Sequence, residues 1–163
     1  MRNKEFEVIE CGGGGNCFFH AISRGLQENN IILSYVELRQ MLSDWLADFD
    51  NAREFEYIFG ATPRDIVPFL GHLDHHCPSA IGWTALTENW TWQDWGIYLR
   101  EDGRWAGGLE ITPMNLCFKL YGINSNVNLW KKDIHLLCEE TLNSNTILIM
   151  LSNNHFQYLK ETL

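Results

Sequence analysis

The sequence predicts a single α+β domain over residues 1–163, with most helices before residue 122 and most strands after it. Apolar residues recur at helical spacing in the first part, whereas short β-branched and aromatic segments dominate the second. A chain of 163 residues with 45 % hydrophobic content is long and apolar enough to bury one core. This composition also argues against disorder.

The first part of the chain predicts one strand followed by several capped helices. Asn16 and Ser34 are suitable N-cap residues, and Thr62-Pro63 combines a cap with a proline at the first helical position. The expected elements are a strand over Phe6–Ile9 and helices over Cys17–Gln27, Tyr35–Phe49, Ala52–Phe59 and onward from Pro63.

The second part predicts an irregular, tryptophan-rich segment over residues 78–104, then one helix and a group of strands. Within the irregular segment, we expect Ile97–Arg100 to be a strand or the end of a helix. Ser152-Asn153-Asn154 is typical of a hairpin turn between the last two strands. The expected elements are a helix over Leu109–Tyr121 and strands over Ile123–Trp130, Ile134–Leu137, Thr146–Leu151 and His155–Leu159.

Charge and composition restrict the classes of function. The net charge of −9 disfavours a nucleic-acid partner and favours a basic protein surface. Apolar runs such as Ile147–Leu151 are too short to span a membrane, and the charged N-terminus lacks the pattern of a secretory signal. The five cysteines show no paired spacing, which favours a reducing compartment. We therefore expect a cytoplasmic protein, and we expect a monomer.

A run of glycines, residues 12–15, leads through Asn16 into Cys17 at the start of the first predicted helix. The free N–H groups and the dipole at a helix N-terminus favour a thiolate there, and glycine N–H groups can face a developing oxyanion. No Lys-Ser/Thr pair follows, which disfavours phosphate binding. Taken alone, the stretch leaves a nucleophile and a buried structural cysteine equally open.

A nucleophilic thiol needs a base, and His155 opens the last predicted strand. Strand periodicity places Gln157 on the same face. We expect the Gln157 amide oxygen to accept a hydrogen bond from Nδ1–H of His155, so that Nε2 faces the thiol. The alternative for His155 is a half-exposed strand residue, and His20 is a weaker candidate base because it has no evident orienting partner.

A second histidine cluster lies in the middle of the chain. Its spacing matches no common zinc pattern, so we expect surface polar residues and neither a metal nor a cofactor. The cluster consists of His72, Asp74, His75, His76 and Cys77.

Three motifs together resemble the ovarian tumour (OTU) family of cysteine proteases. The family motif Asp-Gly-Asn-Cys-Leu/Phe-Phe-x-Ala is matched by Gly14–Ala21, apart from glycine at its first position. The motif Trp-Gly-Gly-x-x-Glu-Leu/Ile is matched by Trp105–Ile111, with Ala106 for the first glycine. The motif Asn-His-Tyr-x-x-Leu/Val is close to Asn154–Leu159. The likeness runs from about Val8 to Leu159, and the middle region carries little of it.

The resemblance implies a papain-like fold, with a central mixed sheet flanked by helices, and a deubiquitinase activity. It implies that Cys17 is the nucleophile and His155 the general base. Gln157 is the expected residue that orients the histidine, and Asn153 and Asn154 are the alternatives for that role. The backbone N–H groups of the Gly14–Cys17 loop, which includes Gly15 and Asn16, would form the oxyanion hole. The implied partner is ubiquitin or a polyubiquitin chain, whose basic tail suits an acidic enzyme.

The departures from the family pattern keep two alternatives open. Gly14 stands where the family has aspartate, and Gln157 where it often has aspartate or asparagine. The alternatives are a pseudo-protease that binds ubiquitin without cleaving it, and a Cys-His protease or deamidase with another substrate. If the protein is microbial, we expect delivery to a host cytosol.

Three further expectations concern the loop and the second motif. Without the aspartate carboxylate, the glycine loop is expected to be loose until ubiquitin binds. Trp105 and Glu110 are expected to be structural, the latter as a polar anchor near a helix start. The tryptophan-rich stretch Trp83–Trp95 is either part of a ubiquitin-binding surface or part of the core.

Overall fold

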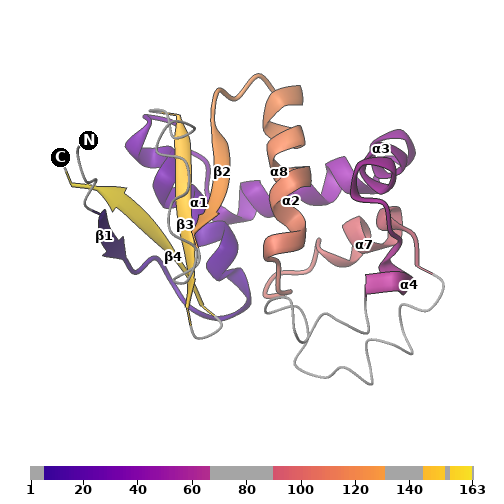
Figure 1. Ribbon diagram of the computed structural model, residues 1–163, viewed down its shortest axis with the longest axis horizontal. Coiled ribbons are helices and arrows are strands. Elements are labelled where there is room, and N and C mark those ends of the chain that lie inside the picture. The colour runs from indigo at the N-terminus through magenta and orange to yellow at the C-terminus, as the bar shows by residue number, and fades with distance from the viewer. Residues whose placement is uncertain (1–5, 67–89, 131–144, 153–154, 163) are drawn as a thin grey trace.

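The sheet is mixed, and its strands come from both ends of the chain. The computed structural model describes residues 6–66, 90–130, 145–152 and 155–162. The strands are β1 (Phe6–Ile9), β2 (Asn126–Trp130), β3 (Thr146–Ser152) and β4 (His155–Glu161). Their order is β1-β4-β3-β2 (Figure 1). β4 pairs antiparallel with β1 and β3, whereas β2 and β3 run parallel, so the predicted α+β fold with a mixed sheet is confirmed.

The helices cover the sheet and extend away from it. They are α1 (Cys17–Glu28), α2 (Tyr35–Ala47), α3 (Phe49–Phe59), α4 (Pro63–Ile66), α7 (Trp92–Tyr98) and α8 (Gly108–Leu120). α1 packs on β3 and β4, and α8 contacts β2 and α2. α2 continues past α8 to meet α3 and α7 on the side away from the sheet (Figure 1). None of the helices in the described part of the chain has the length and apolarity that a membrane crossing requires.

Most predicted elements are confirmed, and the wrong boundary between the second and third predicted helices has a clear reason. α2 ends at Ala47 and α3 begins at Phe49, whereas the sequence predicted one helix to about Phe49 and another from Ala52. Asp48 explains the difference, because its backbone is extended and its side chain accepts the N–H groups of Asp50 and Asn51. It therefore caps α3 where the apolar spacing alone continues α2.

The irregular segment predicted over residues 78–104 is wrong in its later part, although a helix does end within Ile97–Arg100, one of the two alternatives expected there. Trp92–Tyr98 forms α7, which begins with a capping box between Thr91 and Asp94. β2 begins at Asn126, three residues after the predicted start. The predicted strand Ile134–Leu137 and residues 67–89 lie outside the described residues.

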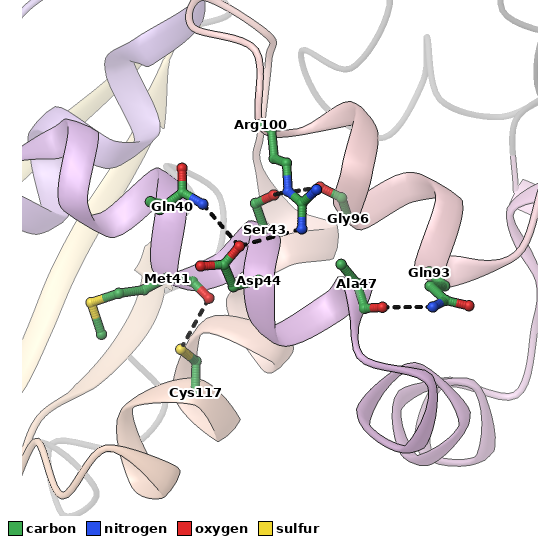
Figure 2. Close-up of polar contacts among 9 residues, drawn as sticks. All are labelled: Gln40, Met41, Ser43, Asp44, Ala47, Gln93, Gly96, Arg100 and Cys117. Atoms are coloured by element: carbon green, nitrogen blue, oxygen red, sulfur yellow. Dashed lines mark hydrogen bonds and ion pairs between the residues drawn. The ribbon is translucent and has the colours of Figure 1, made fainter.

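Polar contacts fix α2 against α7 and α8 (Figure 2). Ser43 on α2 is fully buried, donates to the Gly96 carbonyl at 2.8 Å and accepts from Arg100 Nε at 3.1 Å. Gln93 Nε2 donates to the Ala47 carbonyl at 2.7 Å. Gly96 permits this approach, because a Cβ at that position would lie 2.6 Å from Leu46 Cβ.

Candidate active site

Cys17 is the first residue of α1, and its side chain is fully buried. The sulfur accepts a hydrogen bond from the backbone N–H of Phe156 in β4, so the thiol lies between the helix start and the last strand. Burial raises the pKa of the Cys17 thiol, although N–H groups at the helix start act in the opposite direction. The expected thiolate is therefore wrong for the free protein, because desolvation outweighs the helix terminus.

His155 is the first residue of β4 and directly precedes Phe156. The backbone segment that contacts Cys17 therefore also carries the imidazole. Its Nε2 is hydrogen-bonded to Oε1 of Glu10. In a neutral imidazole whose Nε2–H donates, Nδ1 holds the lone pair and is the nitrogen that can take a proton. The structure thus places His155 next to the residue whose backbone N–H contacts the Cys17 thiol, and the catalytic roles of both residues stay predictions.

Gln157 does not contact His155 in the predicted way. Its Nε2 donates to Oε2 of Glu10 at 3.0 Å. The expected bond from Nδ1–H of His155 to the Gln157 amide is wrong, because the imidazole uses Nε2 and its partner is a carboxylate. Both side chains bind the same group, as their shared face of the strand predicts. The role of Gln157 as an orienting residue stays a prediction, and any such role acts through Glu10.

Sequence reasoning did not identify Glu10. It follows β1, in which Ile9 pairs with Tyr158, so the same register places Glu10 opposite Gln157 and diagonal to His155. The Glu10–His155 contact spans 145 residues of chain. The only available signal was the pairing of the first strand with the last, and no local pattern encodes that pairing.

The glycine loop forms a tight turn before α1. Gly14 has a φ of 76°, in the left-handed region, and the Cys17 N–H donates to the Gly14 carbonyl. Gly15 packs directly on another loop, because a Cβ there would lie 1.6 Å from the Gly103 carbonyl oxygen. Since the Cys17 N–H serves the turn, the N–H groups of Gly14 and Gly15 remain the predicted oxyanion donors.

Asn16 precedes α1 but does not cap it with its side chain. Its Oδ1 accepts from Arg39 Nη2 at 2.6 Å and from the Gly103 N–H at 3.0 Å, and its Nδ2 donates to Asp102 at 3.2 Å. The predicted capping bond is therefore wrong. The side chain instead joins the glycine loop to the loop before α8.

Arg39 on α2 is the second residue that sequence reasoning missed, and it is only 3 % exposed. Its guanidinium donates to the carbonyls of Gly15 at 3.2 Å, Leu99 at 2.9 Å and Arg104 at 2.7 Å, besides Asn16. Burial lowers the pKa of Arg39, and its hydrogen bonds compensate part of the desolvation. The second half of the glycine loop is thus held without ubiquitin, contrary to the expectation of a loose loop.

His20, the weaker candidate base, has a different neighbour. Its ring stacks on Tyr35, with centroids 4.2 Å apart, and burial lowers the pKa of its imidazole. A Cβ at Gly12 would lie 2.9 Å from that ring. These contacts give His20 a packing role at the base of the loop.

In the second motif, Trp105–Ile111, Glu110 has the structural role that was predicted for it. Glu110 is 1 % exposed, and its carboxylate accepts the Gly107 N–H at 2.8 Å and Trp95 Nε1–H at 3.0 Å. Trp105 packs half-buried against the core. Of the tryptophan-rich stretch, Trp92 and Trp95 are buried, which places these two in the core and not on a binding surface.

The remaining candidates lie outside the described residues. These are Trp83, the cluster from His72 to Cys77, and the turn residues Asn153 and Asn154. Within the ranges that the structure describes, no group of three or more His, Cys, Asp or Glu side chains could hold a metal ion. His155 is hydrogen-bonded to Glu10, and the next residue, Phe156, contacts the Cys17 thiol through its backbone N–H. A thiol, an imidazole and a carboxylate are groups that nucleophilic attack on a carbonyl can use.

Comparison with known proteins identifies relatives of the fold. No protein-family model matches the chain, and no curated protein matches it significantly in sequence. Among solved structures, it is similar to an OTU deubiquitinase from Wolbachia pipientis wMel bound to ubiquitin, with a TM-score of 0.63 and 14 % identity. That match covers 96 % of each chain.

Two viral structures give the same result. The chain is similar to the OTU domain protease of Dera Ghazi Khan virus, with a TM-score of 0.58, 15 % identity, and coverage of 97 % of this chain and 82 % of that one. For the OTU domain protease of Taggert virus, the TM-score is 0.51 at 19 % identity, with coverage of 96 % and 80 %. The resemblance predicted from three short motifs is therefore confirmed at the level of the fold.

Proposed function

We propose that this chain is a deubiquitinase that hydrolyses the isopeptide bond after the C-terminal glycine of ubiquitin. The observation that carries the proposal is the position of Cys17, whose thiol is hydrogen-bonded to the backbone next to His155 within an OTU fold. A structural cysteine needs no imidazole at that place. The solved Wolbachia relative is bound to ubiquitin, which supports the same partner for this chain.

In the proposed reaction, Cys17 attacks the carbonyl carbon while His155 takes the thiol proton. Burial raises the pKa of Cys17, so proton removal must accompany the attack and makes His155 a general base. The N–H groups of Gly14 and Gly15 stabilise the oxyanion. The C–N bond then breaks, His155 gives the proton to the departing lysine amine, and a thioester remains. Water, deprotonated by His155, hydrolyses the thioester and releases ubiquitin.

The overall charge of the chain fits this substrate. A net charge of −9 attracts a basic protein tail, and such complementarity raises the rate of encounter more than the final affinity. The thiols of Cys11, Cys17 and Cys117 are free, which suits a reducing compartment.

A ubiquitin-binding pseudo-protease is the second candidate, because glycine occupies position 14 where relatives have aspartate. The contacts of Asn16 and Arg39 weigh against it. They hold the loop without that aspartate, and a protein that only binds has no need of a positioned imidazole.

The test is a ubiquitin that carries a thiol-reactive electrophile at its C-terminus. We expect the wild-type protein to gain the mass of one ubiquitin, and Cys17→Ala to gain none. Cys117→Ala is the matched control, since it removes another fully buried helical thiol and should react like wild type. Mass spectrometry of the intact protein gives the result.

Two outcomes would contradict the proposal. Binding of ubiquitin without an adduct on the wild-type protein favours the pseudo-protease. Neither binding nor an adduct favours a Cys-His protease or deamidase that acts on another substrate.

A further inference from the structure

We propose that Glu10 is the residue that positions His155, and that Gln157 serves to hold Glu10. This inference rests on the proposed function, because it assigns a partner to the general base of that reaction. The motif pattern gives no reason to choose Glu10, which lies seven residues before the nucleophile and belongs to none of the three motifs.

The Glu10 carboxylate is held on both oxygens. Oε1 is hydrogen-bonded to Nε2 of His155 and receives the Gly12 N–H at 3.4 Å. Oε2 receives Nε2–H of Gln157 at 3.0 Å. A carboxylate with donors on both oxygens has a fixed orientation, whereas a surface ion pair with one contact does not.

Strand pairing explains why this geometry forms. β1 and β4 are antiparallel neighbours, and the continued register sets Glu10 across from Gln157. His155 lies two residues along on the same face of β4, at the diagonal distance that a long side chain reaches. The sheet backbone, and not a flexible loop, therefore sets the separation between the carboxylate and the imidazole.

The charge of Glu10 suits the role. Its hydrogen bond to His155 is the largest cause that lowers the pKa of the Glu10 carboxyl, so the group is ionised at neutral pH. An ionised carboxylate fixes the proton on Nε2, leaves Nδ1 as the base and stabilises the imidazolium that forms during attack. Burial is the main cause that raises the pKa of Cys17, and the charge of Glu10 acts in the same direction, which disfavours a thiolate in the absence of a charged imidazole.

Removal of this contact has little effect on stability. The Glu10 side chain is 60 % exposed, and exposed ion pairs contribute little to folding. Loss of the contact should therefore appear in catalysis and in the state of the imidazole, and the unfolding temperature should stay the same. This separation makes the inference testable.

The experiment compares Glu10→Ala with Glu7→Ala, which removes an exposed carboxylate from the adjoining strand without touching His155. We expect kcat for a fluorogenic ubiquitin C-terminal amide to fall about 100-fold in Glu10→Ala, with KM unchanged, because a misplaced base slows only the chemical step. Glu7→Ala should match wild type. Glu10→Gln keeps an oxygen acceptor and should recover part of the rate.

A second measurement does not depend on activity. Long-range ¹⁵N–¹H spectra of the His155 ring report which nitrogen carries the proton. We expect protonated Nε2 in wild type and Glu7→Ala, and a mixture of both tautomers in Glu10→Ala. Gln157→Ala should give a smaller change in the same direction.

The outcomes separate the two proposals. An unchanged tautomer in Glu10→Ala overturns the inference whatever the activity, and so does a changed tautomer with an unchanged kcat. If the wild-type protein forms no ubiquitin adduct, the proposed function fails, while a tautomer change in Glu10→Ala still supports Glu10 as the residue that positions His155.

Discussion

Gly15 has no room for a side chain, because a Cβ there would lie 1.6 Å from the Gly103 carbonyl oxygen. We predict that Gly15→Ala displaces the loop before Cys17 and lowers kcat/KM by about 100-fold, the size of effect that a shift of about 1 Å produces at a reacting centre. Strain between the two loops should also lower the free energy of unfolding by about 1–3 kcal/mol. Steady-state kinetics and urea denaturation measure both effects.

Gly13→Ala is the control at the same loop. A Cβ at Gly13 meets nothing within 4 Å, and its φ of −97° suits any residue. This variant should keep the wild-type rate and stability. Equal losses in both variants would mean that the loop needs flexibility as such, and not the close approach to Gly103.

At the residue scale, the sequence predicted the groups that lie in local motifs. Cys17 and His155 have recognisable neighbours and begin α1 and β4, as the sequence predicted, while their catalytic roles stay predictions. Glu10 and Arg39 could not be found in this way. Glu10 acts through a strand pairing 145 residues away, and Arg39 occupies a helix position that is buried only because two loops fold over it.

At the scale of elements, Gly96 controls the contact between α2 and α7 (Figure 2). A Cβ there would lie 2.6 Å from Leu46 Cβ and 2.7 Å from the Ala47 nitrogen. We predict that Gly96→Ala destabilises the protein by about 1–3 kcal/mol through overpacking, although the better helix propensity of alanine offsets up to about 1 kcal/mol. Urea denaturation gives the change in the free energy of unfolding.

Ile97→Ala is the matched control on the same helix. Ile97 is 49 % exposed, so its replacement should change stability by less than about 0.5 kcal/mol. The rate constants of both variants, measured well below the unfolding temperature, should equal those of wild type. A neutral Gly96→Ala would show that α7 can move away from α2 without loss.

Element types were easier to predict than element boundaries. Apolar spacing and caps identified α1, α2, α8 and the paired strands β3 and β4. The boundary between α2 and α3 depends on Asp48, whose side chain accepts hydrogen bonds from two backbone N–H groups. The apolar spacing of the sequence continues across this position and gives no sign of the boundary. α7 was missed because four tryptophans between residues 83 and 95 hide its helical spacing, although its Thr91–Asp94 capping box was present in the sequence.

At the scale of the whole molecule, buried thiols set the response to alkaline pH. Burial raises the pKa of Cys117 to about 12 from an ordinary value of 9.0. Above pH 9 the unfolded chain therefore loses a proton that the folded chain keeps, and stability falls as pH rises. This one thiol should lower the free energy of unfolding by about 2 kcal/mol between pH 8 and 10.5.

The measurement is urea denaturation of wild type and Cys117→Ala across that pH range. The variant loses some packing at every pH, so the two proteins are compared by how steeply the free energy of unfolding changes with pH. We expect a shallower alkaline decline in Cys117→Ala. Burial also raises the pKa values of Cys11, Cys17 and Tyr158. The free energy of unfolding should therefore still fall with pH in both proteins, but less steeply in Cys117→Ala. Equal slopes would mean that Cys117 ionises in the folded state as easily as in the unfolded chain.

The place of β4 between β1 and β3 determines when the proposed catalytic site forms. A ribosome delivers Cys17 well before His155, so a growing chain first holds the thiol without its proposed base. Contacts between residues 145 positions apart also form late in folding. The entropy cost of bringing such distant segments together precedes the stabilisation that their pairing gives. Under the proposed mechanism, a copy in which β4 is not yet paired lacks the base and should not react with other proteins.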